Sequence, residues 1–180
     1  MRNNQPTCGL LLCFLFISML QLRAEPTNLM VEDLTFTRPE SWKWAEPTDH
    51  SPAVNRFIVP DASGATKVDV RFYIIKKDYT SERAALRAQF PESKLNDLRE
   101  QELKIGNRKI IYFEIGGTYV YRDHPPKPDQ LQVSAAIPMG KQYVLTRIAG
   151  PRSDVEAVVA TFKKMVEDAV KDHEDEPVLR

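Results

Sequence analysis

The sequence predicts an α+β domain in which an antiparallel β-sheet is flanked by two helices, as in an α/β/α sandwich, and leaves open whether the helices cover one face or both. Apolar and polar residues alternate with period two in several short runs, most clearly from Lys67 to Ile75, which is the pattern of a half-buried strand. Two other stretches, near residues 80–90 and 153–170, have helical composition or spacing instead. Because the connections between strands are mostly of hairpin length, most neighbouring strands are expected to pair antiparallel.

The first 24 residues have the organisation of a secretory signal peptide. Arg2 precedes an apolar run from Gly9 to Leu20, and Leu22-Arg23-Ala24 forms a cleavage site that ends in a small residue. A span across a bilayer takes about 20 apolar residues, so this run is short for one, although an uncleaved N-terminal anchor is the alternative. We expect residues 1–24 to be removed and the mature protein to be exported, periplasmic or secreted, without a membrane span.

Both cysteines, Cys8 and Cys13, lie in this segment, so the mature chain has none and its hydrophobic core must hold the fold. The remainder has the length of one domain, which we place at residues 25–170, and residues 171–180 are expected to be a charged, disordered tail. The whole chain is formally neutral, and residues 1–24 contain two arginines and no acid, which leaves a mature net charge of −2. Nucleic acid is not an expected partner, because no basic field is left to neutralise phosphates.

The first half of the domain is predicted to form three strands and a helix. Residues 25–33 lack periodicity and are expected to be a leader. The strands are Leu34–Thr37, Arg56–Val59 and Lys67–Ile75, the first stopped by Pro39 and the second closed by Pro60. From Thr80 or Ser81 the composition changes to helix formers, which predicts a short helix ended by Pro91.

A hairpin is predicted next. Leu98–Ile105 and Lys109–Ile115 are strand-like and are joined at Gly106-Asn107, which has the composition of a tight turn. Gly116-Gly117 interrupts the second strand, where a bulge is expected. Residues 122–129 contain three prolines and are expected to be a loop, since such a run cannot join a ladder or a helix.

The last strands and the longer helix complete the pattern. Residues 131–137 alternate, and Met139-Gly140-Lys141 turns them into a strand over residues 142–149. Ser153 and Glu156 are spaced as a capping box. Apolar side chains then follow at helical spacing: Val155, Val158, Val159, Phe162, Met165, Val166 and Ala169.

Several short motifs in this pattern resemble the Mog1/PsbP-like domains, specifically the short exported type from bacterial envelopes. Residues 34–42 look like that group's strand with its Pro-x-x-Trp corner at Pro39 to Trp42, and Arg56–Pro60 looks like its second strand. Gln89-Phe90 is similar to the end of its first helix, and Gly117-Thr118-Tyr119 to its Gly-Thr-Tyr strand entry. Gly150-Pro151 before an amphipathic helix also fits, so the resemblance is spread over residues 34–170.

What the resemblance implies is a fold, namely an antiparallel sheet flanked by helices. Members of this group bind different partners, including a small GTPase and photosystem II, so no single function follows from membership. No catalytic residue set is common to the exported bacterial type, and none is carried over to this sequence.

The chain offers little for catalysis or for metal binding. Its histidines lie in expected loops or in the tail, without metal-ligand spacing: His50, His124 and His173. No serine lies in a Gly-x-Ser-x-Gly elbow, and Ser153 is explained as a helix cap. The pair Glu46 and Asp49 has no apolar shielding to separate the two pKa values. We therefore expect no enzyme activity, no cofactor and no metal.

The candidate binding surface is the segment from Tyr119 to Asp129, which combines tyrosine, arginine and histidine with a stiff proline run. Tyrosine and arginine are enriched at binding hot spots, and a stiff segment loses little entropy when a partner immobilises it. Trp42 is expected in the core, whereas Trp44 is the better candidate for exposure. The candidate residues are Trp44, Tyr119, Tyr121, Arg122, His124 and Lys127.

Three functions remain open from these residues. The first is an exported, non-catalytic binding module that uses this segment, with Trp44 as a further contact, to engage an envelope or periplasmic protein. The second is an accessory or carrier protein with a small ligand or a metal between sheet and helix. The third is a purely structural domain, in which residues 119–129 are an ordinary solvent loop.

Overall fold

The structure is a computed structural model that describes residues 25–47, 51–76, 78–92, 98–122 and 124–175. The expected signal peptide, residues 1–24, lies outside the described residues, as do residues 176–180 of the expected tail. Neither of the two helices in the described part of the chain combines the length and the hydrophobicity that crossing a membrane requires.

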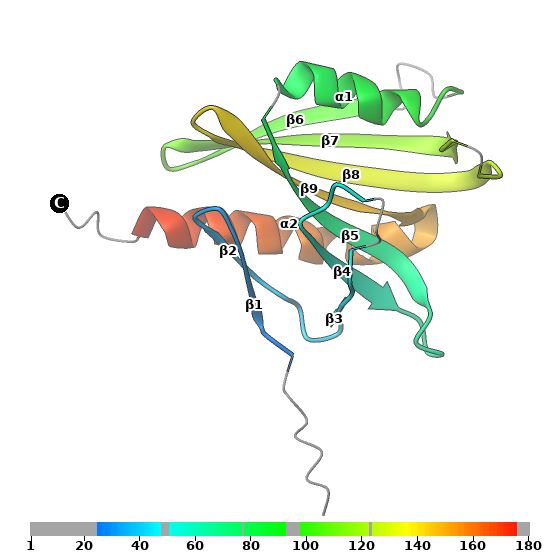
Figure 1. Ribbon diagram of the computed structural model, residues 1–180, viewed down its shortest axis with the longest axis horizontal. Coiled ribbons are helices and arrows are strands. Elements are labelled where there is room, and N and C mark those ends of the chain that lie inside the picture. The colour runs from blue at the N-terminus through cyan, green and yellow to red at the C-terminus, as the bar shows by residue number, and fades with distance from the viewer. Residues whose placement is uncertain (1–24, 48–50, 77, 93–97, 123, 176–180) are drawn as a thin grey trace, which may run out of the picture.

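Seven antiparallel strands form the main sheet, and a separate two-stranded hairpin lies beside it (Figure 1). The sheet order is β3-β4-β5-β9-β8-β7-β6, and consecutive strands pair except where α1 separates β5 from β6. The elements are β1 (Asn28–Val31), β2 (Leu34–Thr37), β3 (Lys43–Trp44), β4 (Asn55–Pro60), β5 (Thr66–Ile75), α1 (Tyr79–Ala88), β6 (Leu98–Ile105), β7 (Arg108–Tyr119), β8 (Lys127–Met139), β9 (Gln142–Pro151) and α2 (Arg152–Asp175).

The larger hydrophobic core lies between the sheet and α2. Phe162 and Val166 of α2 are fully buried against alternate residues of the central strands, among them Phe72 of β5 and Val133 of β8. The β1–β2 hairpin closes the same side, where Phe36 packs edge to face on Phe72 with ring centroids 5.1 Å apart. The apolar stripe that the sequence shows along α2 is therefore the surface that attaches this helix to the sheet.

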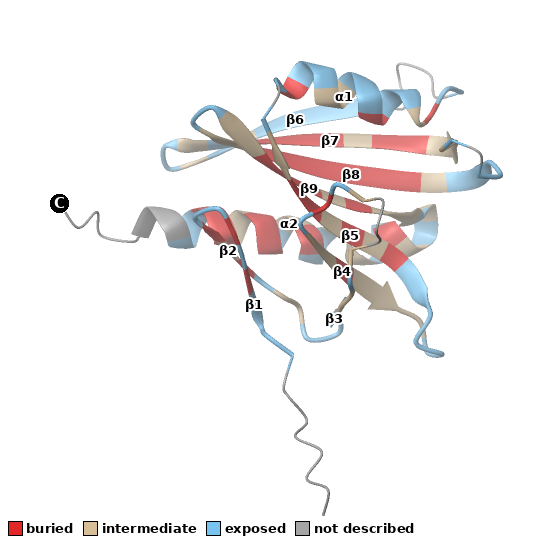
Figure 2. Cartoon of the chain, in the orientation of Figure 1, coloured by how far each residue is buried: buried red, intermediate tan, exposed pale blue. Residues whose placement is uncertain are grey.

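The opposite face carries α1 and a smaller core. Leu86 of α1 and Phe90, just beyond its end, pack over Phe113 of β7 and Leu145 of β9. Because successive residues of a strand point to opposite faces, Phe72 faces α2 whereas Tyr73 faces α1. The two helices thus cover opposite faces, a point that the sequence leaves open, and the predicted antiparallel sheet with two flanking helices is confirmed. The longest unbroken buried run lies in β8, where residues 131–137 are all buried (Figure 2).

Several boundaries differ from those expected. Residues 25–33 are not only a leader, because Asn28–Val31 forms β1 and pairs with β2. The proline-rich stretch is a loop only up to Pro126, since β8 begins at Lys127, which pairs with Tyr119. Pro128 is accommodated because it lies near the strand's start, where a missing N–H costs little.

The two helices also begin or end at other residues than expected. Asp78 caps α1, and its carboxylate accepts a hydrogen bond from the Ser81 amide at 2.9 Å. Helix α2 begins at Arg152, so Ser153 lies inside its first turn rather than before it. The helix continues to Asp175, and residues 171–175 of the expected disordered tail are therefore helical. The predicted bulge is confirmed, since the β7–β8 register shifts between Gly117 and Tyr119.

Candidate binding groove

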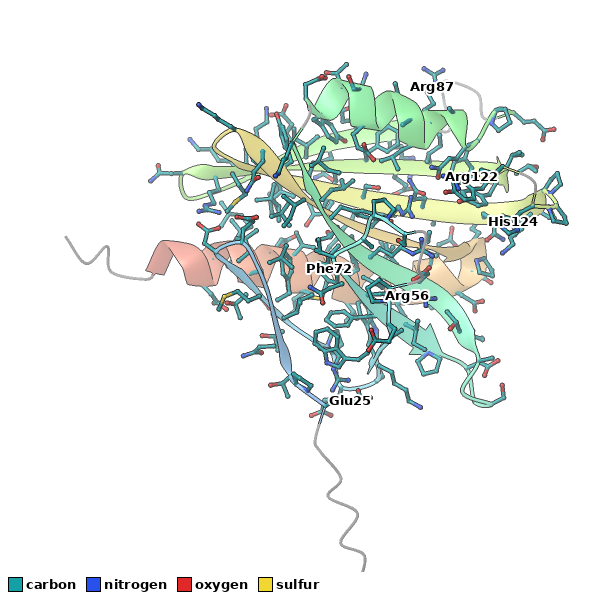
Figure 3. All side chains as sticks on the ribbon, viewed as in Figure 1. Glu25, Arg56, Phe72, Arg87, Arg122 and His124 are labelled. Carbon is teal, nitrogen blue, oxygen red and sulfur yellow. The ribbon has the colours of Figure 1, made fainter. Side chains whose placement is uncertain are left out.

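A groove with a volume of about 1460 Å³ lies on the α1 face of the sheet. Helix α1 packs over only part of this face, and the groove occupies the part over β4, β5, β9 and the start of β8. Arg56 of β4 lines one side, while Arg122 and His124, next to the start of β8, line the other (Figure 3). The groove is therefore built by strands that are distant in the sequence.

The lining is basic, although the whole chain is neutral. Seven lysines and arginines but only three acidic residues line the groove. The full sequence has 25 basic and 25 acidic residues, so positive charge is concentrated here. A concave surface with one sign of charge attracts ligands of the opposite sign.

Three arginines on neighbouring strands form a row, which we call the arginine row: Arg56, Arg71 and Arg147. Arg56 of β4 lies directly opposite Arg71 of β5, and Arg71 lies directly opposite Arg147 of β9. All three line the groove. Like charges in directly opposite positions destabilise a sheet unless a countercharge is present.

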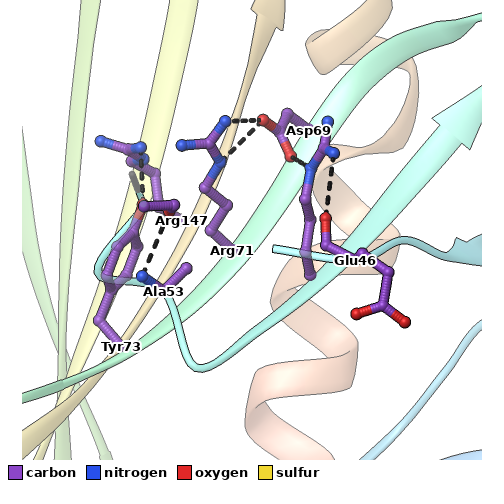
Figure 4. A network of polar contacts seen from close by, with 8 residues as sticks. Glu46, Ala53, Asp69, Arg71, Tyr73 and Arg147 are labelled. Carbon is purple, nitrogen blue, oxygen red and sulfur yellow. Dashed lines mark hydrogen bonds and ion pairs between the residues drawn. The ribbon is translucent and has the colours of Figure 1, made fainter. Parts of the chain in front are cut away.

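One carboxylate, that of Asp69, forms ion pairs with both Arg56 and Arg71 (Figure 4). Its Oδ1 accepts from Arg56 Nε at 2.8 Å, and its Oδ2 accepts from Arg71 Nε at 2.8 Å. Burial lowers the pKa of the Arg71 guanidinium, but the ion pair with Asp69 outweighs burial and leaves that pKa above its usual value. Both ion pairs are partly buried, with the Asp69 side chain 23% exposed.

Arg147 has no carboxylate partner among the described residues. Its Nη2 donates a hydrogen bond of 2.7 Å to the hydroxyl of Tyr73, and its guanidinium carbon lies 5.3 Å from the centroid of the Tyr73 ring. A guanidinium has five N–H donors, so most of the donors of Arg147 remain available to a ligand.

Uncharged polar side chains without partners lie beside the arginines. Gln132 of β8 lines the groove and is 1% exposed, yet its Oε1 and its Nε2 have no hydrogen-bond partner among the described residues. The buried hydroxyl of Ser134, directly opposite Arg147, has none either. Gln89, at the end of α1, also has an unpartnered Oε1 and lines the groove. Such groups are rare in folded proteins, where buried polar atoms are almost always paired.

Stacked rings form one wall of the groove, which we call the aromatic wall: Tyr119, Tyr121 and His124. Tyr119 and Tyr121 stack with centroids 6.3 Å apart, and Tyr121 stacks on His124 at 6.2 Å. The guanidinium carbon of Arg122 lies 5.0 Å from the Tyr121 ring centroid. Burial raises the pKa of the Tyr119 hydroxyl, so this group stays protonated and can donate. The rings of this wall therefore pack on one another within the chain itself.

The wall is tied to α1 by the main chain. The amide of Val120 donates a 2.8 Å hydrogen bond to the carbonyl of Gln89, and the Phe90 ring packs on Tyr119 with centroids 5.5 Å apart. The position of α1 thus sets the position of the aromatic wall.

The structure brings five of the six predicted site residues to the groove: Tyr119, Tyr121, Arg122, His124 and Lys127. Trp44 lies elsewhere. Its indole Nε1 donates to the carbonyl of Pro26 at 2.7 Å, and its ring packs edge to face on Phe57 with centroids 4.8 Å apart. This tryptophan is half-buried against the core on the α2 side.

Sequence reasoning missed the arginine row and Gln132. The signal was the polar face of the strand over residues 67–75, where Asp69, Arg71 and Tyr73 alternate with the apolar residues. Arg147 likewise lies on the polar face of the strand over residues 142–149, directly opposite Arg71. Their meeting depends on the pairing of β5 with β9, which lie far apart in the sequence.

The described residues include no cluster of three or more histidine, cysteine, aspartate or glutamate side chains that could hold a metal ion. The polar groups that line the groove include arginine, tyrosine and glutamine side chains.

The seven-stranded order, with one helix on each face, defines a PsbP-like α+β domain. Among solved structures, the chain is similar to the solution structure of cyanobacterial PsbP (CyanoP) from Synechocystis sp. PCC 6803. The TM-score is 0.51 at 10% sequence identity, and the match covers 89% of this chain and 95% of that one. This likeness confirms the predicted Mog1/PsbP-like fold. No family model matches the sequence, and no curated protein matches it.

Proposed function

We propose that this protein is an exported, non-catalytic binding module of the cell envelope that holds a partner protein in the groove. The observation that carries the proposal is the basic groove itself, with its row of three arginines facing a wall of stacked rings. Arginine and tyrosine are the residue types that contribute most at protein interfaces.

The order of the aromatic wall supports this function. Tyr121 stacks on Tyr119 and on His124, so their rotamers are already restricted in the free protein. Side chains that are fixed in advance lose less entropy on binding, which favours affinity. The groove also exceeds the roughly 300–1,000 Å³ that is usual for small-molecule sites, which favours a macromolecular partner.

Affinity capture from an envelope extract of the source organism tests this function. We expect a reproducible partner with the unaltered protein, and loss of that partner when Arg122, His124 and Lys127 are all replaced by glutamine. Capture that persists unchanged with this triple variant would contradict the assignment of the groove.

The matched control removes positive charge outside the groove. Arg99 and Lys164 are exposed and do not line the groove, so Arg99→Gln with Lys164→Gln should leave capture unchanged. Equal loss in both variants would indicate a general charge effect and no site.

A small-ligand carrier is the second candidate, favoured by the unpartnered amide of Gln132. A ligand at 100 times its dissociation constant stabilises the folded state by about 2.7 kcal/mol. Thermal unfolding in the presence of metals, sugars, lipids and nucleotides tests this candidate, and the absence of any shift would count against it.

A further inference from the structure

We infer that the groove recognises an acidic segment of an extended polypeptide, in which a carboxylate binds Arg147 and a neighbouring peptide bond binds Gln132. This inference rests on the proposed function, because it specifies the chemistry of the partner. It follows from three features of the groove.

The first feature is an incomplete balance of charge. Three arginines lie in directly opposite positions on β4, β5 and β9, but only Asp69 faces them as a paired carboxylate among the described residues. Arg147 is the arginine left without one, and it is half-buried. A ligand carboxylate supplies the planar, two-oxygen acceptor that matches a guanidinium.

The second feature is the amide of Gln132, which is buried with both of its polar atoms unpartnered within the part of the chain that the structure describes. Its Oε1 needs an N–H or O–H donor, and its Nε2 needs an acceptor. A free carboxylate offers acceptors only, so it leaves Oε1 unpaired. A peptide bond offers one donor and one acceptor, which is the complement of the Gln132 amide.

The third feature is the spacing of the two groups. Arg147 lies opposite Ser134, and Gln132 lies two residues along the same strand β8, so Arg147 and Gln132 are diagonal neighbours. Diagonal neighbours in a sheet are about 7–8 Å apart. One acidic residue with its adjoining peptide bond spans a similar distance, so a single segment can reach both groups.

The test measures binding of two blocked octapeptides to the full chain by fluorescence anisotropy. The first alternates glutamate with alanine, and the second alternates glutamine with alanine. We expect the acidic peptide to bind and to weaken as salt is raised, and we expect the neutral peptide to bind at least about tenfold more weakly.

Variants of Arg147 then locate the site. Arg147→Gln should weaken binding of the acidic peptide at least about tenfold. Arg147→Lys keeps the charge but loses the two-pronged geometry, so its affinity should be intermediate. Arg99→Gln, the same change outside the groove, should bind as the unaltered chain does. Thermal unfolding of each variant checks that it is folded.

Two further binding measurements distinguish a peptide ligand from a small carboxylate. One uses the variant Gln132→Leu, and the other uses free glutarate as the ligand. Gln132→Leu should weaken the acidic peptide but leave any glutarate binding unchanged. Glutarate that binds as tightly as the octapeptide would overturn the inference in favour of a small-molecule site. Equal binding of the two octapeptides, or of neither, would also overturn it.

Failure of this inference can be told apart from failure of the proposed function. A captured partner that depends on the groove but is indifferent to acidic peptides would overturn this inference alone. Self-association of the full chain that Arg147→Gln abolishes would identify a second copy as the occupant, and would likewise overturn it.

Discussion

Gln132 is a residue whose role can be tested without any ligand. Its buried amide has no partner in the free protein, so replacement by leucine removes an unpaired polar group at nearly the same volume. We expect Gln132→Leu to raise the free energy of unfolding by about 1 kcal/mol, measured by urea denaturation. Gln130→Leu is the control, because the Gln130 amide already donates to the Pro128 carbonyl at 3.0 Å. A loss of stability in Gln132→Leu would show that its amide is satisfied.

Asp69 is the residue that balances the arginine row. Asp69→Asn keeps the size of the side chain but removes the countercharge of Arg56 and Arg71. Because these pairs are partly buried, we expect the free energy of unfolding to fall by about 1–3 kcal/mol. The same variant should bind the acidic octapeptide more tightly, since the groove gains positive charge. Weaker peptide binding in a folded Asp69→Asn protein would contradict the electrostatic account.

At the residue scale, the sequence predicted the aromatic and basic side chains that follow one another along the chain. Tyr119, Tyr121 and Arg122 are grouped in the sequence, and their composition alone pointed to a surface. Arg56 and Arg147 could not be placed together, because their meeting requires two pairings in register through β5. Trp44 was interpreted from its position alone, and the Pro26 carbonyl that holds its indole lies 18 residues away.

At the element scale, two glycines mark where strands approach other groups closely. A methyl group at Gly150 of β9 would lie 2.8 Å from the backbone oxygen of Lys67, whereas one at Gly116 of β7 would meet the flexible end of Arg152 first and lie 3.2 Å from the nearest backbone atom, the Gln130 oxygen. A backbone obstacle cannot move aside as a side chain can. Gly150→Ala should therefore lower the free energy of unfolding by about 1–3 kcal/mol, and Gly116→Ala by less. Urea denaturation of both variants checks the order, and equal losses would contradict it.

The start of α1 is expected to be sensitive to acid. Hydrogen bonds from the Ser81 amide and hydroxyl lower the pKa of the Asp78 carboxyl below its usual value of 3.8. A lowered pKa in the folded state means that the cap stabilises the helix above about pH 4, and that this contribution is lost as the pH falls through the lowered pKa. We expect the protection factor of the Ser81 amide, which is its hydrogen exchange relative to the intrinsic rate at each pH, to fall over that range.

Asn can cap a helix without titrating, so it provides the control for this acid sensitivity. In Asp78→Asn, the fall in the Ser81 protection factor should disappear. A fall of the same size in both proteins would assign it to another group.

At this scale the sequence identified almost every element, because period-two alternation and helix-former composition are local signals. The errors were two missed short strands, β1 and β3, and several boundaries. Strand β1 has too little alternation of its own and is recognised through its partner β2. The prolines around Lys127 are typical of a loop, so the sequence does not predict that β8 begins there. The start of β8 is set by its pairing with β7.

At the scale of the whole molecule, the two helices are attached by cores of different size. The core under α2 contains Phe162 and apolar residues of the β1–β2 hairpin. The core under α1 is smaller and is built around Leu86 and Phe90. A helix held by less buried apolar surface opens at lower free energy. We expect native-state hydrogen exchange to show α1 opening below the global free energy of unfolding, with α2 exchanging only on global unfolding. Equal protection of the two helices would contradict this.

This difference bears on the groove, since the Gln89 carbonyl at the end of α1 holds the aromatic wall through Val120. Movement of α1 would therefore widen or narrow the groove, while the arginine row stays on the rigid strands β4, β5 and β9. The antiparallel fold with two helices was predictable from the sequence. The uncovered part of the α1 face was not, because it depends on where the shorter helix packs across the sheet.

Site-directed photo-crosslinking in cells of the source organism tests the central claim, that the groove holds a protein partner. A photoreactive amino acid in place of Tyr121 lies in the groove, and one in place of Lys164 lies on the exposed side of α2. We predict one discrete crosslinked protein from the Tyr121 position, its loss on addition of Arg147→Gln, and no discrete product from the Lys164 position. The same products from both positions, or a Tyr121 product unaffected by Arg147→Gln, would contradict the account.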